Sequence, residues 1–211
     1  MVLENKISFE GRILGVQPRI RLLRSFDERH HAYLGYTLRI NGSVGGEKGD
    51  FVIGIGKETE LKYGIQVGDN IRGQCMHVED PRLESLMYYK VSKIELYNRA
   101  VEITQGHPPW YGVPPALEVY RERGHRRLDQ KTYDAKCTCC IWGCLMPVEM
   151  IVDQWNPTRR RYRQETFCYG PKSCIYYHAG RKRTVPGRNG MSWTEEDWID
   201  EESTKHRNMD E

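Results

Sequence analysis

Cysteine placement constrains the fold of this chain more than any other feature, because six of its seven cysteines fall into two short clusters. The first cluster spans residues 137–144 and reads CTCCIWGC, and the second spans residues 168–174 and reads CYGPKSC. Two thiolates separated by two residues, as in Cys137 and Cys140, can hold one side of a tetrahedral metal ion on a tight turn. A hairpin of the residues between the clusters can bring the second cluster beside the first.

Two metal centres fit this spacing, and the sequence favours a structural zinc ion. Zinc ribbons use two knuckles of paired cysteines, whereas the second cluster here has an unusual C-x5-C spacing. An iron–sulfur cluster is the alternative, because three thiolates of the first cluster lie close together, although their spacing matches neither ferredoxin pattern. More candidate ligands are present than one ion needs, and the sequence does not choose among them: Cys137, Cys140, Cys144, Cys168 and Cys174.

The cellular compartment supports a metal over disulfides. The first nine residues lack the basic and apolar regions of a signal peptide, and the chain has no run of 18 apolar residues. We therefore expect a cytoplasmic protein without a membrane partner, in a compartment where thiols stay reduced.

The first hundred residues read as short strands separated by turns. Alternating apolar and polar residues, bounded by glycine and Asn-Gly turns, predict half-buried strands. We expect strands over residues 7–23, 31–40, 51–55, 70–78 and 88–96, and a short helix over residues 60–63. The first strand is interrupted by Gly11, Gly15 and Pro18, which mark bends or bulges.

Five strands in this order, with a helix between the third and fourth and the turn Val67-Gly68-Asp69, resemble the OB-fold, a partly open five-stranded barrel. The resemblance covers residues 5–98 and extends to OB-fold nucleic-acid-binding proteins with an appended zinc-ribbon-like module. An SH3-type barrel is the structural alternative. The expected fold class is mainly β, with an OB-like barrel followed by a small zinc-stabilised β-hairpin module.

The remaining chain divides by composition. After a barrel over residues 1–100, a proline-rich connector and a short basic helix occupy residues 101–136, and the cysteine-rich zinc module occupies residues 137–180. Within the module, residues 147–151 and 162–167 are expected to form the hairpin. Residues 181–211 form a tail that is expected to be partly disordered, mainly after Glu202. Two tryptophans in this tail, Trp193 and Trp198, indicate that part of it packs against the barrel or a second subunit.

The basic charge of the chain is concentrated around the cysteines. Residues 121–190 contain 15 Lys and Arg against 6 Asp and Glu, whereas residues 191–211 contain 2 against 8. A basic block interleaved with aromatic side chains is typical of phosphate and base contacts. The candidate nucleic-acid-binding residues, in the barrel, the connector and the hairpin, are Arg19, Arg21, Tyr33, Arg39, Arg126, Arg127, Trp155, Arg159, Arg160, Arg161 and Arg163.

These patterns favour a non-catalytic protein that binds single-stranded DNA or RNA through the barrel and the basic zinc module. No metalloprotease-type histidine spacing, nucleotide-binding glycine loop or Ser/His/Asp arrangement indicates an enzyme. Two other functions stay open: a protein-interaction scaffold with a structural zinc ion, and an iron–sulfur redox or sensor protein. The sequence also leaves open a homo-oligomer, and whether the acidic tail packs on the basic block of its own chain.

Overall fold

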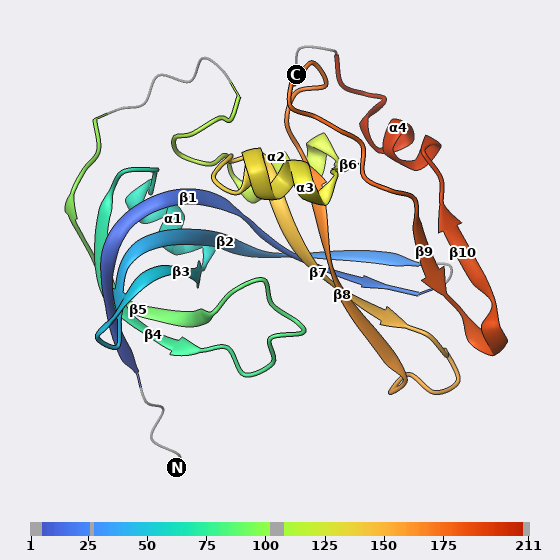
Figure 1. Ribbon diagram of the computed structural model, residues 1–211, viewed down its shortest axis with the longest axis horizontal. Helices are drawn as coiled ribbons and strands as arrows, with labels where there is room; N and C mark the ends of the chain where they lie inside the picture. Colours follow the sequence, from blue (N-terminus) through green and yellow to red (C-terminus); the bar gives the residue numbers. More distant parts are fainter. Residues whose placement is uncertain (1–5, 26–27, 102–107, 209–211) are drawn as a thin grey trace.

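The computed structural model of the chain describes residues 6–25, 28–101 and 108–208, which form a mainly β protein (Figure 1). The strands are β1 (Ile7–Arg24), β2 (Arg29–Val44), β3 (Glu47–Ile55), β4 (Asn70–His77), β5 (Tyr88–Asn98), β6 (Arg126–Arg127), β7 (Gly143–Ile151), β8 (Arg160–Cys168), β9 (Arg183–Pro186) and β10 (Ser192–Glu195). The helices are α1 (Lys57–Tyr63), α2 (Leu117–Arg123), α3 (Gln130–Thr132) and α4 (Trp198–Thr204), with a π-helical turn η1 (Tyr133–Cys137) and a 3-10 turn η2 (Arg188–Gly190). Among these residues, no helix is both long and apolar enough to cross a bilayer.

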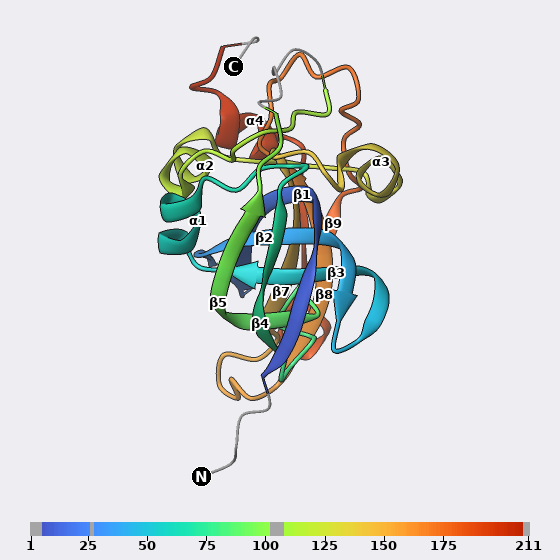
Figure 2. The same cartoon turned by 90° about the vertical axis from the view of Figure 1, so that its left-hand side faces the viewer.

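The first five strands close into a ring, shown end-on in Figure 2. β1 pairs with β2 on one side and with β4 on the other, and the order around the ring is β1-β2-β3-β5-β4. Four of the five contacts are antiparallel, and β3 meets β5 in parallel at Ile53 and Tyr88. The five strands and the helix predicted in this half of the chain are all present.

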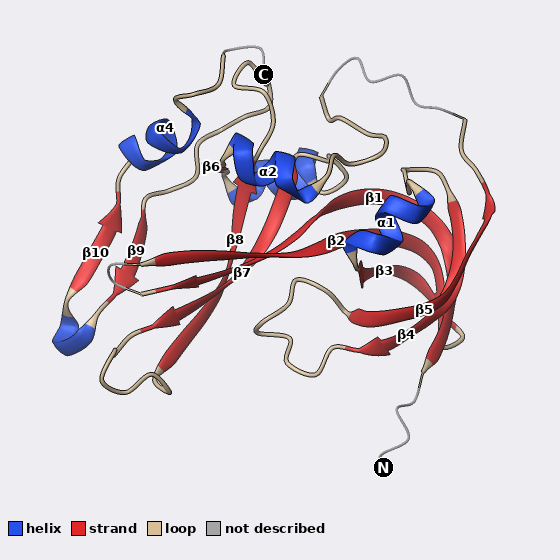
Figure 3. Cartoon of the chain, turned by 180° about the vertical axis from the view of Figure 1, so that it is seen from behind, coloured by secondary structure: helices blue, strands red, loops and turns tan. Residues whose placement is uncertain are grey.

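β1 and β2 are long enough to leave the ring and enter a second group of strands (Figure 3). The end of β1, at Leu22–Arg24, pairs in parallel with Val148–Met150 of β7. β7 and β8 form the antiparallel hairpin predicted between the cysteine clusters, and β6 covers the end of β8. The ring and the hairpin therefore belong to one eight-stranded mixed sheet.

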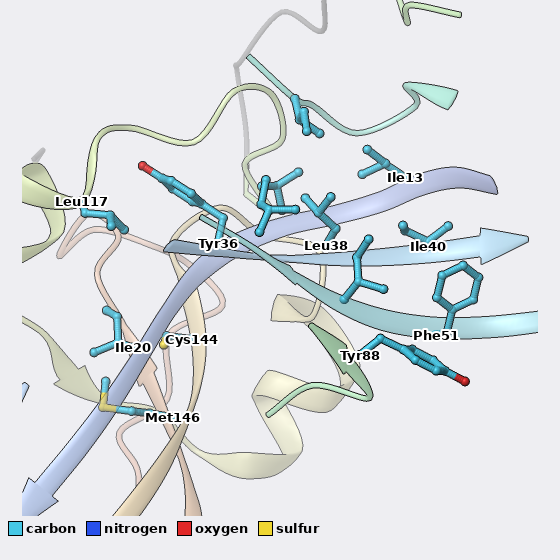
Figure 4. Packing of buried hydrophobic residues seen from close by; sticks show 14 of the residues in the cluster. Ile13, Ile20, Tyr36, Leu38, Ile40, Phe51, Tyr88, Leu117, Cys144 and Met146 are labelled. Atoms are coloured by element: carbon cyan, nitrogen blue, oxygen red, sulfur yellow. The ribbon is translucent and has the colours of Figure 1, made fainter. Parts of the chain in front are cut away.

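One apolar core runs through both groups of strands (Figure 4). In the ring it contains the alternating residues of β2 and β3, such as Leu38 and Ile53, both fully buried. In the hairpin it contains Cys144 and Met146, which lie beside Ile20 of β1. Because side chains alternate across a strand, the polar neighbours of these residues lie on the other face.

A bulge in β2 changes which face each side chain occupies. Arg19 pairs with Gly35, but the next residue, Ile20, pairs with Tyr33, so one residue of β2 has no opposite partner. An extra residue reverses the alternation beyond it. Tyr33 therefore packs against the core, and it does not share an outward face with Arg39 as the sequence pattern predicts.

The acidic tail packs on the chain's own basic residues. Glu195 of β10 is buried and forms ion pairs with Arg24, at 3.2 Å, and with Arg29, at 3.0 Å. Asp200 of α4 accepts a hydrogen bond of 2.8 Å from the buried guanidinium of Arg127. The sequence leaves open whether the acidic tail packs on basic residues of its own chain, and these contacts show that it does.

The tail also makes close backbone contact with the end of α2. Gly124 has a φ of +66°, and a Cβ atom there would lie 2.2 Å from the carbonyl oxygen of Ser203. Helix α4 extends to Thr204, two residues beyond the position after which the sequence predicts disorder. Buried ion pairs, which composition does not reveal, hold this segment in place.

Candidate metal centre and nucleic-acid interface

Both cysteine clusters lie at the same end of the β7–β8 hairpin. Gly143, the first residue of β7, pairs with Cys168, the last residue of β8. The turn that contains Cys137 and Cys140 directly precedes β7, and its backbone closes with a 3.1 Å hydrogen bond from the Cys140 N–H to the Cys137 carbonyl oxygen. The loop that leads to Cys174 directly follows β8. The hairpin register thus brings the two clusters together.

Four thiols in this region are mutual neighbours. Burial raises the pKa of Cys137 to about 12, and the thiols of Cys140, Cys168 and Cys174 add to the shift. Burial also raises the pKa of Cys140 to about 12, with further contributions from Cys168 and Cys174. The pKa of Cys168 is raised by burial and, to a smaller extent, by Cys174. These effects on Cys137, Cys140 and Cys168 place the four thiols in one neighbourhood.

Backbone N–H groups and arginines surround these sulfur atoms. The N–H of Gly170 donates to Sγ of Cys168 at 3.4 Å, and the N–H groups of Trp142 and Trp110 hydrogen-bond the Cys140 thiol. The guanidinium groups of Arg126 and Arg207 lower the pKa of Cys168 against the effect of burial. Donors and positive charges of this kind favour the thiolate form over the thiol.

Cys144 lies apart from the other four candidate ligands. It is fully buried in the core, and its thiol donates to the carbonyl oxygen of Pro18 at 3.5 Å. Residues that alternate along β7 point to opposite faces of the sheet, and Cys144 points into the core. The structure therefore reduces the five candidates to Cys137, Cys140, Cys168 and Cys174.

The four side chains do not form a finished coordination shell. Across residues 6–25, 28–101 and 108–208, no group of three or more His, Cys, Asp or Glu side chains has an arrangement that could hold a metal ion as it stands. The cysteines in the same residues form no disulfide and are all free. The site is thus a cluster of neighbouring free thiols and not a closed coordination shell.

The candidate nucleic-acid residues of the barrel are largely occupied by internal contacts. Arg19 and Arg21 both bind the buried carboxylate of Glu84, at 2.5 and 2.7 Å. Tyr33 is covered by the guanidinium of Arg121, 4.8 Å from its ring centroid. Arg39 is half-buried and lines a cavity of about 30 Å³ with residues of η1 and the cysteine turn. This side of the ring is therefore not an open stacking surface.

The two candidates from the connector also have internal roles. Arg126 stacks on Tyr177, 3.8 Å from the ring centroid, and donates to the carbonyl oxygen of Pro171 at 3.0 Å. Arg127 is only 1% exposed and binds Asp197 and Asp200 of the tail. Both arginines hold the cysteine loop or the tail in place, and neither presents its charge to solvent.

Three of the candidate nucleic-acid-binding residues in the hairpin lie at the surface, at the end of the strands away from the thiols. Trp155 is 83% exposed, and Arg159 and Arg161 are exposed without an ion-pair partner among the described residues. Arg160 pairs with Glu149, and Arg163 pairs with Glu165. The hairpin register places the arginines of the tip away from the cysteines, because the tip lies at the opposite end from Cys168.

Beside the hairpin, a basic groove runs between β8 and β9, and the sequence analysis missed it. The groove has a volume of about 660 Å³, and five of its lining residues are basic: Lys131, Arg163, Arg181, Lys182 and Arg183. Lys131 and Arg181 form no ion pair with any described residue. The run Arg181-Lys-Arg183 signals this charge in the sequence, but only the fold places it beside β8.

In comparisons with known proteins, no family model matches this chain, and no curated protein and no solved structure matches it.

Proposed function

We propose that this chain is a non-catalytic single-stranded nucleic-acid-binding protein, built on an OB-like barrel and a structural zinc centre. The strand order of the ring supports the OB-like assignment, because a five-stranded Greek-key barrel closes through a parallel contact of its third and fifth strands. The basic groove between β8 and β9 is the observation that carries the binding proposal.

Zinc suits the donor set of the cysteine cluster. Four thiolates are the ligands of a closed structural zinc site, and N–H···S bonds such as that from Gly170 to Cys168 offset the charge that they bring. Side chains occupy alternative staggered rotamers, so a change of χ1 redirects a cysteine sulfur without moving the backbone. Bound zinc would fix the loop of residues 168–174 to the turn before β7.

The basic groove suits a phosphate backbone. Lys131 and Arg181 in the groove, and Arg161 two residues before Arg163 on β8, have no internal carboxylate to neutralise them within the described chain. Unpaired cations along a groove attract phosphates and release counterions when a strand binds. Trp155 at the hairpin tip adds an exposed aromatic face on which a base can stack.

A salt titration tests this proposal. The affinity of labelled single-stranded 12-mers of DNA and RNA would be measured by fluorescence anisotropy between 50 and 300 mM salt. Each phosphate contact on a single strand contributes about −0.7 to the slope of log affinity against log salt. The variant Arg161→Glu/Arg181→Glu should bind at least tenfold more weakly at low salt, and its slope should be about 1.4 shallower.

The matched control reverses two charges elsewhere. Lys48 and Lys57 are exposed on β3 and α1, so Lys48→Glu/Lys57→Glu changes the net charge equally without touching the groove. The control should keep most of the affinity. Equal losses of affinity in both variants would show that net charge alone explains the effect, and would reject the groove as the binding surface. If the protein bound neither oligomer, the proposed nucleic-acid-binding function would be rejected.

A further inference from the structure

A second cavity lies on a different side of the chain, between the start of β2, the end of α2 and α4. Its volume is about 580 Å³. It is lined mainly by cationic, histidine and aromatic side chains: Arg29, His30, His31, Tyr33, Arg121, His125 and Trp198. Among the described residues, one acidic side chain lines it, that of Glu202, and Glu202 already binds Lys205.

The charge at this cavity is not fully balanced by the protein. Arg121 lies on the face of Tyr33 and has no carboxylate partner among the residues of known placement. Arg29 shares the buried carboxylate of Glu195 with Arg24, and Arg24 also pairs with Glu165, which binds Arg163 and Arg183 as well. Two carboxylates therefore serve four guanidinium groups. An anion in the cavity would complete this set of charges.

Two histidines that line the cavity also favour an anion there. His31 and His125 contact each other with ring centroids 4.9 Å apart, and Nε2 of His31 is buried without a hydrogen-bond partner in the described chain. Burial, together with the neighbouring arginines, lowers the pKa of His31 to about 4, and burial lowers the pKa of His125 as well. The site therefore holds these two rings neutral beside unbalanced guanidinium charge, which is an environment that favours an incoming anion.

The aromatic side chains narrow the ligand class. Trp198 is 60% exposed although it lines the cavity, and no ring contact or cation–π contact of its indole is present among the described residues. An exposed indole beside guanidinium groups suits a ligand that carries both a flat ring and a phosphate. A volume of about 580 Å³ falls in the range of small-molecule pockets.

We infer that this cavity binds a nucleotide, with its phosphate at Arg121 and Arg29 and its base against Trp198. The ligand is a free mononucleotide or the phosphorylated end of a strand, because both present the same chemistry. This site lies on elements other than β8 and β9, so the inference stands even where the basic groove binds nothing.

Calorimetric titration of the full chain with AMP, adenosine and inorganic phosphate tests the site. AMP should bind at least tenfold more tightly than adenosine or phosphate, since only AMP engages both parts of the cavity. Arg121→Gln and Trp198→Ala should each weaken AMP binding tenfold or more, and Arg121→Lys should recover part of the loss. Arg121 and Trp198 are exposed, so unfolding curves should show that these variants remain folded.

The groove variant Arg161→Glu/Arg181→Glu separates the two proposals. It should leave AMP affinity unchanged while it weakens oligonucleotide binding. Oligomers with and without a 5′-phosphate then identify the source: a preference as large as that of AMP over adenosine assigns the cavity to strand ends, and its absence assigns the cavity to free nucleotides. Equal binding of phosphate and AMP, no AMP binding at millimolar concentration, or full affinity in Arg121→Gln would overturn the inference.

Discussion

The side-chain amide of Gln17 donates a hydrogen bond of 2.9 Å to the carbonyl oxygen of Cys140. The same nitrogen donates to the carbonyl oxygen of Cys137 at 2.7 Å, and Oε1 of Gln17 accepts from the hydroxyl of Tyr133 at 2.7 Å. One buried residue of β1 therefore satisfies both ends of the cysteine turn and fixes η1 against the sheet. The cysteine cluster and the ring are joined through this contact.

Replacing Gln17 should destabilise the cysteine turn and its attachment to the ring. Gln17→Leu leaves the buried hydroxyl of Tyr133 without its acceptor, which costs about 1–3 kcal/mol. It also removes one of the two hydrogen bonds to each of the Cys137 and Cys140 carbonyl oxygens, at about 1 kcal/mol each. We expect the free energy of unfolding to fall by roughly 2–5 kcal/mol in urea titrations. Tyr133→Phe removes one of these hydrogen bonds and should cost about 1 kcal/mol. Equal effects of the two variants would contradict the central role of Gln17.

Metal content should distinguish Cys174 from Cys144. We expect about one zinc per chain by mass spectrometry of protein purified without added metal, and a colourless sample. Cys174→Ser should lose the zinc, whereas Cys144→Ala should keep it and lose stability through the cavity it creates. Iron with visible absorbance would favour the iron–sulfur alternative, and the absence of any metal would reject the zinc centre.

Breaking a buried ion pair of the tail should cost much more stability than breaking an exposed one. Arg127→Met leaves the buried carboxylate of Asp200 without its cation, and breaking a buried pair in this way costs about 3–5 kcal/mol. Lys182→Met removes an exposed cation that binds Glu196 of the same tail, and this should cost far less because water screens an exposed ion pair. Chemical denaturation measures both values. A small effect of Arg127→Met would mean that the tail does not contribute to stability.

Glu60 should make stability depend on pH near neutrality. Burial raises its pKa to about 7, and its Oε2 has no partner in the described residues. Between pH 4.5 and 7 the unfolded chain releases this proton while the folded chain keeps it, so the free energy of unfolding falls as the pH rises. Glu60→Gln removes this loss. Above pH 7 the variant should be more stable than the wild type by up to about 3 kcal/mol, with little difference at pH 4.5.

His31 should lower the free energy of unfolding as the pH falls, whereas Glu60 lowers it as the pH rises. Its pKa in the folded state is about 4, so below pH 6.5 the unfolded chain binds a proton that the folded chain does not. The free energy of unfolding therefore falls as the pH drops from 6.5 to 4. His31→Gln should reduce this fall by roughly 2–3 kcal/mol, as measured by urea unfolding at several pH values. A fall of unchanged size in the variant would contradict the shift. The groups that face His31 are Arg24, Arg29, His30, His125 and Glu195.

Local sequence patterns suffice to predict most of the strands of this protein. Strand periodicity located β1 to β5 and the β7–β8 hairpin, because burial of one face imposes a period of two on a strand. Spacing also identified the cysteine clusters, and composition located the basic block. These features depend on neighbours along the chain, so they can be read without the fold.

Which of these residues lie together depends on contacts between distant parts of the chain. The hairpin register separates Cys144 from the four clustered thiols, and a single bulge in β2 turns Tyr33 away from Arg39. Folding also decides which charges remain free: Arg127 is neutralised by Asp200, more than 70 positions away in the chain, whereas Arg181 keeps its charge at the groove. Composition counts charges, but only long-range contacts determine which of them are buried with a partner and which face solvent.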